Sequence, residues 1–291
     1  EIRFCDWSSD VCSSDLFYQY YKHGPLARTV LGQLQVQGVD YAYTLQGWLK
    51  GVNSDSLLDD DGKTGSIVSK DAYRFSLNYF NGDYAAISSS LAGAFPGHSG
   101  YMETAEAGNY KPLYNGNISS MVVGVPKLGE TKLYNYRYDQ LNRITGMDTW
   151  KGFAAGTANP WSGITKTDEY KERISYDANG NILTYKRNGN DAQLSMDDLT
   201  YGYNKDIAGQ LVNNKLRHVK DAVGDDNYIE DKDIDNQGDD NYEYDAIGNL
   251  TKDTKEGIDN IEWTVYGKIK KITKSNGTEI GYTYDVAGNR I

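Results

Sequence analysis

Few side chains in this sequence have the types and spacing that catalysis needs. Histidine occurs only at His23, His98 and His218, and these positions show neither zinc-ligand spacing nor the pattern of a histidine-based triad. Residues 97–101 (GHSGY) resemble a nucleophile elbow, but a tyrosine stands in place of the closing glycine. The glycine motifs that bind phosphates or dinucleotides do not occur. We therefore expect no catalytic residue and no cofactor.

Two acidic clusters could supply oxygen ligands for calcium. In DKDID, the residues Asp231, Asp233 and Asp235 have the alternation of the first three ligands of an EF-hand loop. However, Asn236 stands where the loop requires glycine, and the bidentate glutamate is missing. The cluster DDDG at residues 59–62 fails similarly, because a leucine occupies its first ligand position. We interpret both clusters as solvated acidic turns and expect no metal site.

Aromatic side chains offer another kind of binding chemistry. Trp48, Trp150, Trp161 and Trp263, together with 25 tyrosines, could form stacking platforms for sugars. In that case the chain would be a carbohydrate-binding or adhesion module of a cell surface. The alternative is that these rings pack in the interior of a sheet, with the tyrosine hydroxyl reaching a partner or water.

Composition limits the class of protein that positions these residues. A chain of 291 residues with 38% hydrophobic content is long enough to bury a substantial core. The formal net charge is -11, without a lysine-rich or arginine-rich block, which disfavours a nucleic-acid partner. No apolar stretch approaches the roughly 20 residues that a membrane-spanning helix needs. We expect a folded chain without a membrane span.

The first sixteen residues (EIRFCDWSSDVCSSDL) have no apolar core and no periodicity. From Asp6 onwards they resemble the translation of a DNA sequencing adapter, so we expect residues 1–16 to be non-native. Both cysteines, Cys5 and Cys12, lie in this segment. The alternative is a genuine N-terminus in which these two cysteines form a disulfide. The rest of the chain has no cysteine, so cysteine usage does not indicate a redox compartment.

A short motif recurs through the second half of the chain. Complete or nearly complete copies are YRYDQLNRI from Tyr136, ISYDANGNIL from Ile174, YEYDAIGNL from Tyr242 and YTYDVAGNRI from Tyr282. A degenerate copy, LTYGYNKDIAGQL, begins at Leu199, and IEWTVYGKIKKI from Ile261 reads as an intervening strand pair. The unit is about 20 residues, a period typical of repeat architectures. A longer gap predicts an insertion or a decayed copy at residues 221–240.

Each copy has the chemistry of a β-hairpin. Tyr242 and Tyr244 are two residues apart, which places both rings on one face of a strand. Asp245 ends the strand, because its side chain can accept hydrogen bonds from backbone amides further along the turn. Gly248 and Asn249 then supply the positive φ that the connection needs. Because an isolated hairpin is marginally stable, the units should associate side by side and share their aromatic rows. The alternative is a set of unrelated hairpins in a β-sandwich.

At these residues the chain resembles the YD-repeat, or RHS, family. The first half adds YYKHGPLARTVLG from Tyr20, VQGVDYAYTLQGWLKGVN from Val36 and FSLNYFNGDY from Phe75, which resemble segments of Bacteroidetes-type members. The resemblance implies an all-β fold, in which a spiral of antiparallel hairpins forms part of a curved sheet or hollow shell. Such shells enclose a C-terminal toxin or effector until delivery. The residues that we expect to carry the repeat have structural roles in packing and turns: Tyr136, Tyr138, Asp139, Tyr176, Asp177, Gly180, Asn181, Tyr201, Tyr203, Tyr242, Tyr244, Asp245, Gly248, Asn249, Trp263, Tyr266, Tyr282, Tyr284, Asp285, Gly288 and Asn289.

The predicted organisation has three parts: residues 1–16, an RHS-associated β region at 17–130, and a YD-repeat region at 131–291 that we expect to be truncated at its C-terminus. The expected partners are the remainder of the same polypeptide, namely further repeats, a core region and a C-terminal cargo. A carbohydrate or cell-surface ligand remains the alternative partner. The resemblance implies a secreted or surface-exposed protein. Because a cut sheet has open edges, the isolated segment should be prone to aggregation.

Overall fold

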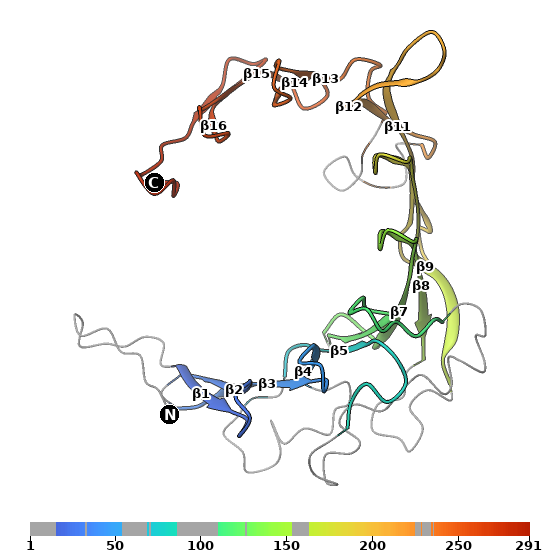
Figure 1. The fold of residues 1–291 in the computed structure, drawn as a ribbon, viewed down its shortest axis with the longest axis vertical. Coiled ribbons are helices and arrows are strands. Elements are labelled where there is room, and N and C mark those ends of the chain that lie inside the picture. The colour runs from blue at the N-terminus through green and yellow to red at the C-terminus, as the bar shows by residue number, and fades with distance from the viewer. Residues whose placement is uncertain are drawn as a thin grey trace. The chain divides into compact units, whose positions relative to one another are not determined.

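The computed structural model describes residues 16–32, 34–53, 69, 71–85, 110–125, 127–152, 163–224, 228, 234 and 236–291. Within these ranges the fold is all-β, as predicted, and contains no helix (Figure 1). The strands are β1 (Leu16–Tyr20), β2 (Leu26–Leu31), β3 (Gln37–Tyr43), β4 (Leu49–Val52), β5 (Arg74–Asn78), β6 (Ser120–Gly124), β7 (Lys132–Tyr138), β8 (Ile144–Lys151), β9 (Thr165–Tyr176), β10 (Ile182–Asn188), β11 (Ser195–Lys205), β12 (Leu211–Asp221), β13 (Tyr242–Tyr244), β14 (Leu250–Asp253), β15 (Ile258–Trp263), β16 (Ile269–Lys274) and β17 (Glu279–Gly281).

The strands pair strictly in sequence order. Strands β1 to β12 form one sheet and β13 to β17 a second, each strand hydrogen-bonded to the next along the chain. Every strand pair whose register is defined is antiparallel, as in the hairpins β7–β8 and β11–β12. The chain divides into two units, Glu1–Lys171 and Glu172–Ile291, and the boundary lies within β9. This meander of hairpins confirms the predicted antiparallel fold class.

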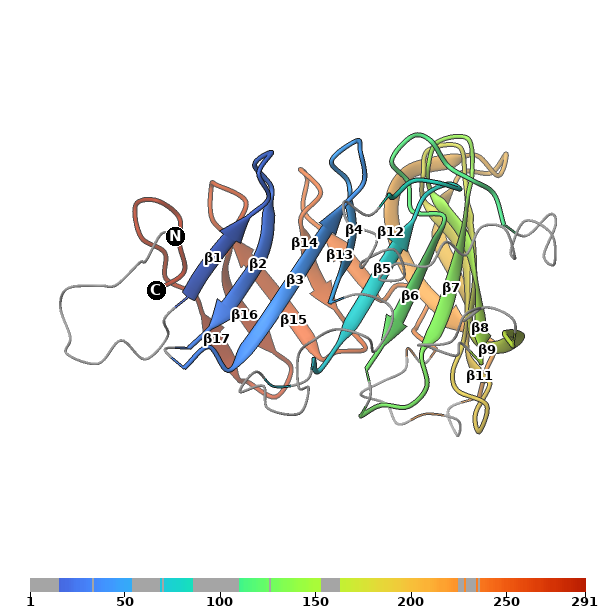
Figure 2. The same cartoon turned by 90° about the horizontal axis from the view of Figure 1, so that it is seen from below.

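The apolar core of the first unit lies on β6 to β8, which Figure 2 shows as adjacent strands. Val122, Leu133 and Trp150 are directly opposite one another across the three strands, and at most 1% of each is exposed. Tyr110 and Ile164 complete this cluster. Residues on either side of Val122 in β6 alternate between buried and half-buried, as expected for a strand with two unequal faces. The rows of cross-strand partners therefore supply the packing.

The first unit also buries a charged pair. The Lys50 ammonium on β4 contacts both carboxylate oxygens of Asp83, at 2.9 and 3.1 Å. It also donates to Asn78 Oδ1, 2.8 Å away, on β5. The side chains of Lys50 and Asp83 are 3% and 7% exposed. Because buried charges need partners, this pair fixes the loop that follows β5 against the sheet.

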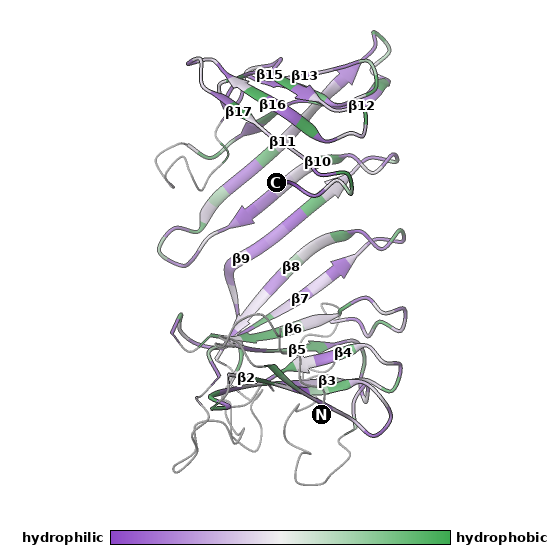
Figure 3. Cartoon of the chain, turned by 90° about the vertical axis from the view of Figure 1, so that its left-hand side faces the viewer, coloured by the Kyte–Doolittle hydropathy of each residue, from purple (hydrophilic) through white to green (hydrophobic). Residues whose placement is uncertain are grey.

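In the second unit, strands β10 and β11 are mostly hydrophilic, as their purple colour in Figure 3 shows. Among its described residues, the buried hydrophobic side chains are Leu199, Val219 and Ile261. A buried carboxylate accompanies them, because Asp197 on β11 pairs with Arg187 on β10 at 2.5 Å. With so thin an apolar core, side-chain hydrogen bonds take a larger part in joining neighbouring hairpins.

The two sheets are connected within the second unit by hydrogen bonds around β12. The amide of Gln237 donates to the carbonyl of Val219 (3.1 Å), and the amide of Val219 donates to Gln237 Oε1 (2.8 Å). Asn241 donates to the carbonyl of Arg217 over 3.0 Å. Residues before β13 thus occupy the edge of β12. They fall in the gap where the sequence predicts an insertion; residues 225–227, 229–233 and 235 of that gap lie outside the described residues.

Candidate functional site

The aspartate of each repeat folds back onto its own turn. Asp245 Oδ1 accepts hydrogen bonds from the amides of Ile247, Gly248 and Asn249, at 3.0, 2.8 and 2.8 Å. Its second oxygen, Oδ2, accepts from the Asn249 side-chain amide at 2.9 Å. The backbone closes the same turn, because the Asp245 amide donates to the Asn249 carbonyl over 2.9 Å. Four donors therefore surround one carboxylate.

This turn is a three-residue hairpin connection with a left-handed third residue. Gly248 has φ of 102° and donates its amide to the Asp245 carbonyl. A left-handed residue in that place produces a bulge, and the strand register does shift between Glu243 and Tyr244. The expectation that Asn249 also adopts positive φ is wrong. Asn249 instead contributes the side-chain amide that bonds Asp245, because one left-handed residue is sufficient to close the turn.

The turns at Asp177 and Asp285 repeat this geometry. Asp177 Oδ1 accepts from the amide of Asn181 at 2.9 Å, and Oδ2 from its side-chain amide at 2.7 Å. Asp285 makes the same two contacts with Asn289, at 2.7 and 3.1 Å. The intervening glycines are left-handed, with φ of 94° at Gly180 and 82° at Gly288.

The turn at Asp139 uses different residues for the same roles. Asn142 takes the left-handed position (φ 62°), which asparagine tolerates better than most residues. Arg143 takes the place of the last asparagine and donates its Nε to Asp139 Oδ2 over 2.7 Å. Asn142 and Arg143 therefore stand where the other copies have glycine and asparagine. Leu141 lies at the tip, where 67% of its surface is exposed.

These hydrogen bonds change the acidity of the turn aspartates. For Asp177, the side-chain hydrogen bond from Asn181 lowers the pKa, and backbone amides lower it further. For Asp245, desolvation raises the pKa, but the backbone and side-chain hydrogen bonds of Asn249 outweigh it, so the pKa falls. The pKa values of Asp139 and Asp285 are lowered by the same kind of contact. The ionised carboxylate is thus the form that each turn holds.

Further turns of this kind occur where the motif is weak. Asp206 Oδ1 accepts from the amides of Ala208 (2.9 Å) and Gln210 (2.8 Å), and Gly209 is left-handed. Threonine replaces aspartate at Thr44 and Thr264, where the hydroxyl oxygen accepts an amide at 3.1 Å. In the sequence, these turns can be recognised by an Asp or Thr that stands three residues before a glycine.

In four hairpins an aromatic side chain near the turn donates a hydrogen bond to an earlier part of the sheet. Tyr284 donates its hydroxyl to the carbonyl of Ile269 over 2.8 Å, and Tyr203 donates to Ile182 over 3.0 Å. Both acceptors are the first residue of the returning strand in the hairpin before. Tyr138 makes the equivalent bond to the Ile118 carbonyl, at 2.9 Å. We call this contact the aromatic clamp.

Tryptophan fills the same role in the hairpin of β15 and β16. Trp263 immediately precedes the turn residue Thr264 and donates its indole Nε1 to the carbonyl of Leu250 over 2.7 Å. Tyr266, which is also one of the expected repeat residues, lies at the tip of this turn with 87% of its surface exposed. The turn opens at Thr264, so the ring that precedes it belongs to Trp263, and Tyr266 is a residue of the turn itself.

The remaining repeat tyrosines lie half-buried along the strands. Tyr242 and Tyr244 flank an exposed Glu243, as expected for one shared face. The hydroxyl of Tyr242 accepts from Gln237 Nε2 at 2.8 Å, and burial raises the pKa values of both tyrosines. Tyr136, Tyr176, Tyr201 and Tyr282 are also half-buried.

No protein-family model matches this chain, and no curated protein does. Solved structures that match it are large toxin components. A mutant of the Photorhabdus luminescens Tc holotoxin pore aligns over 95% of this chain with 12% identity and a TM-score of 0.45. The TcdB2-TccC3-TEV structure covers 99% at 11% identity (TM-score 0.36), and TcdB2-TccC3 covers 99% at 9% identity (TM-score 0.28). The chain spans only 12–14% of the length of these solved chains.

The histidines that could do chemistry have local contacts where they are described. His23 stacks on Tyr21 with 5.4 Å between ring centroids. His218 lies beside Gly202, where a Cβ atom would approach the ring nitrogen to 2.3 Å, so a larger residue there would require the ring to move. His98 and both acidic clusters lie outside the described residues. The described part of the chain contains no group of three or more potential metal ligands, and none of its elements is a helix able to cross a bilayer.

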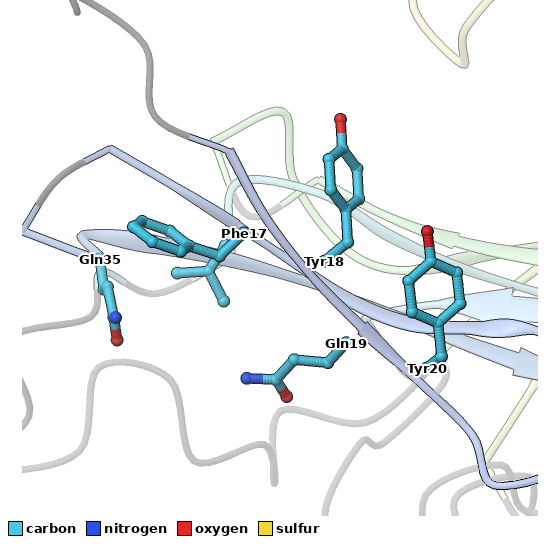
Figure 4. Close-up of a pocket in the computed structure, with 6 residues that line it drawn as sticks. Phe17, Tyr18, Gln19, Tyr20 and Gln35 are labelled. Carbon is cyan, nitrogen blue, oxygen red and sulfur yellow. The ribbon is translucent and has the colours of Figure 1, made fainter. Parts of the chain in front are cut away.

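The tryptophans proposed as sugar platforms occupy different surroundings. Trp150 is 1% exposed in the core, and Trp263 is half-buried in its clamp. Trp48 packs against Tyr79 with 5.0 Å between ring centroids, and Trp161 lies outside the described residues. A pocket of about 500 Å³ beside β1 is lined by other residues (Figure 4): Phe17, Tyr18, Gln19, Tyr20, Val30 and Gln35. The burial of Trp150 removes it from the carbohydrate hypothesis.

Proposed function

We propose that this segment is a non-catalytic, structural part of an RHS or YD-repeat shell wall. The observation that carries the proposal is one hairpin design that recurs with different residues. The turns satisfy their own polar groups, and the hairpins of Tyr138, Tyr203, Trp263 and Tyr284 add an aromatic clamp to an earlier part of the sheet. The clamp is present with tyrosine at Tyr203 and Tyr284 and with tryptophan at Trp263. A contact that persists when its donor changes has a structural role.

The turn aspartates suit a wall better than a reaction site. Asp245 uses both oxygens to accept donors from its own turn. Its lowered pKa makes it a poor proton donor near neutral pH. A carboxylate that is already surrounded by amides is also a poor nucleophile and a poor ligand for a metal.

The wall, in this proposal, encloses a C-terminal toxin or effector domain and takes part in its delivery, as the sequence resemblance implies. Its partners are further repeats, a core region and the cargo, all in the same polypeptide. The protein is exported, to the cell surface or beyond. Support for enclosure comes from the side-by-side hairpins, because within each of the two sheets every strand is hydrogen-bonded to the next and leaves no backbone gap for a protease.

Limited proteolysis of the full polypeptide that contains this segment tests the proposal. The C-terminal domain should resist protease in the native protein. It should become sensitive when Tyr203→Phe, Trp263→Phe and Tyr284→Phe are combined, because three clamps lose their donor. Tyr266→Phe is the matched control, since Tyr266 is exposed at a turn tip. A C-terminal domain that is cleaved equally fast in the native protein and the triple variant would refute enclosure by this wall.

A further inference from the structure

The buried contact between Lys50 and Asp83 includes a third polar side chain, that of Asn78. Lys50 Nζ lies 2.8 Å from Asn78 Oδ1 and 2.9 Å from the nearer carboxylate oxygen of Asp83. All three residues are buried, and Asn78 is only 2% exposed. A primary amine, a carboxamide and a carboxylate therefore meet away from water. An ion pair alone requires no carboxamide at the amine, whereas a reaction between the two side chains does.

A β-bulge directs Lys50 into this cluster. On β3, Ala42 and Tyr43 are consecutive, but their partners on β4, Gly51 and Leu49, are separated by Lys50. Lys50 is therefore the extra residue of the bulge. Bulges commonly redirect a side chain, and they are frequent beside reactive sites.

The bulge by itself does not bury a lysine. In the hairpin of β15 and β16, the register shift leaves Lys270 as the extra residue, in the same place as Lys50. The side chain of Lys270 is 62% exposed and pairs with Glu262 at 3.2 Å. The burial of Lys50 beside an amide and a carboxylate is thus particular to β4 and β5, which are neighbours in the sheet (Figure 2).

The carboxamide of Asn78 is held with its oxygen toward the amine. Its Nδ2 donates to Ser120 Oγ on β6 at 3.3 Å, which leaves Oδ1 for Lys50. Given ordinary carbonyl geometry, a nitrogen 2.8 Å from Oδ1 lies about 3.6 Å from Cγ. Reacting atoms attack from about 3–3.5 Å, so a shift of a few tenths of an ångström brings Nζ to the carbon.

Asp83 is also fixed in place. The backbone amide of Tyr79 donates to Asp83 Oδ2 over 2.9 Å, while both carboxylate oxygens contact Lys50 Nζ. Tyr79 is 4% exposed, donates its hydroxyl to the Leu49 carbonyl and packs against Trp48. The carboxylate therefore lies where it can take protons from the amine, next to a pair of packed rings.

We propose that Lys50 Nζ and Asn78 Cγ join in an intramolecular isopeptide bond, with Asp83 transferring the protons. The Lys50 ammonium first gives one proton to the Asp83 carboxylate, which leaves both buried groups uncharged. The electron pair on Nζ then attacks Cγ. A second proton passes from Nζ through Asp83 to Nδ2, the Cγ–Nδ2 bond breaks, and ammonia leaves. The products are an uncharged amide and a protonated Asp83, and no oxidant or reductant is needed.

The bond would tie β4 to β5 across 28 positions of the chain. It forms once in each molecule and has no external substrate, so it does not make the segment an enzyme. Its role is to make the pairing of two wall strands permanent, since a sheet with this link cannot separate at β4 and β5 without breaking a covalent bond.

Mass spectrometry of the folded whole chain tests the proposal. The intact mass, measured after denaturation, should lie about 17 Da below the mass of the sequence, because one ammonia is lost. Trypsin should not cleave after the acylated Lys50. The digest should contain a branched peptide that joins residues 29–63 to residues 75–127, since trypsin cleaves after Arg28, Lys63, Arg74 and Lys127.

Variants assign the roles of the three residues. Lys50→Met lacks the nucleophile and should have the mass of its own sequence. Asp83→Ala should also keep its full mass, because it loses acid–base assistance worth about 10²–10⁴-fold in rate. Lys270→Met is the matched control and should show the same loss of ammonia as the native chain. The native chain and this control decide whether the bond forms even if Asp83→Ala fails to fold.

Four results would overturn the proposal. The native chain could have the full mass of its sequence. It could lose ammonia without giving a branched peptide, which would assign the loss to a cyclic imide at an asparagine–glycine pair such as Asn81–Gly82. It could lose water, about 18 Da, which would make Asp83 and not Asn78 the acyl group joined to Lys50. Finally, a folded Asp83→Ala variant could form the bond as completely as the native chain, which would remove Asp83 from the reaction.

Discussion

The hydroxyl of Tyr203 donates a hydrogen bond to the carbonyl oxygen of Ile182, 3.0 Å away, across the boundary between two hairpins. Asp177 closes the turn between β9 and β10, and Ile182 is the first residue of β10. The clamp therefore connects Tyr203, near the end of β11, to the start of β10. Backbone pairing holds neighbouring strands together. The clamp adds a contact between the turn end of one hairpin and the turn end of the hairpin before it. It is a specific contact that a generic β-sheet does not require.

Tyr203→Phe should lower the free energy of unfolding of the whole chain by about 0.5–1.5 kcal/mol, because the carbonyl of Ile182 loses its donor. Urea denaturation followed by circular dichroism measures this difference. Tyr266→Phe removes a hydroxyl at an exposed tip and should have no measurable effect. Equal losses in the two variants would show that the clamp adds no stability.

Gly248→Ala should lower the free energy of unfolding by about 1–2 kcal/mol, because alanine disfavours the left-handed backbone found there. The space around this glycine is open, so the cost is conformational and not steric. Gly281→Ala provides the control, since Gly281 also has open space but no left-handed φ. Thermal unfolding of both variants distinguishes the two effects; a control as damaged as Gly248→Ala would contradict this account.

Asp245→Asn should destabilise the chain at pH 7 and have a smaller effect at pH 3. The pKa of Asp245 is lowered by folding, so its contribution is present above the unfolded pKa of about 3.9 and is lost as pH falls through the folded pKa. Urea midpoints at both pH values measure the difference between variant and native protein. An equal deficit at pH 7 and pH 3 would mean that the ionised form is not what the turn selects.

Asp83→Asn should cost about 3–5 kcal/mol, because it leaves the buried Lys50 ammonium without its anionic partner. The double variant Lys50→Met with Asp83→Asn should recover much of this loss, since it removes the uncompensated charge. A double-mutant cycle in urea gives the coupling energy. Additive losses would indicate that Lys50 and Asp83 act independently.

The hairpin turns could be predicted from the sequence because their determinants are local. Asp245, Gly248 and Asn249 all lie within five residues, and the hydrogen bonds that define the turn join only these neighbours. The same locality explains why Asp206 could have been found, since it also stands three residues before a glycine. The spacing of aspartate and glycine is therefore enough to predict such a turn, whatever the rest of the fold is.

Contacts between distant residues could not be predicted in this way. Lys50 reads as an ordinary polar strand residue, and its partner Asp83 is 33 positions further along the chain. Trp263 and Tyr266 were both expected to be structural residues of the repeat, but the sequence did not distinguish the packing ring from the turn residue. The turn begins at Thr264, and this position determines that the ring of Trp263, and not that of Tyr266, contacts the sheet. The domain boundary at residue 131 stays a prediction.

The aromatic clamps have a direction along the chain. In Tyr138, Tyr203, Trp263 and Tyr284 the donor is always later in the sequence than its acceptor. In these four hairpins the clamp therefore joins the new hairpin to a segment that has been synthesised before it. Assembly during synthesis can proceed by adding one unit at a time to a finished edge, with short loop closures at every step.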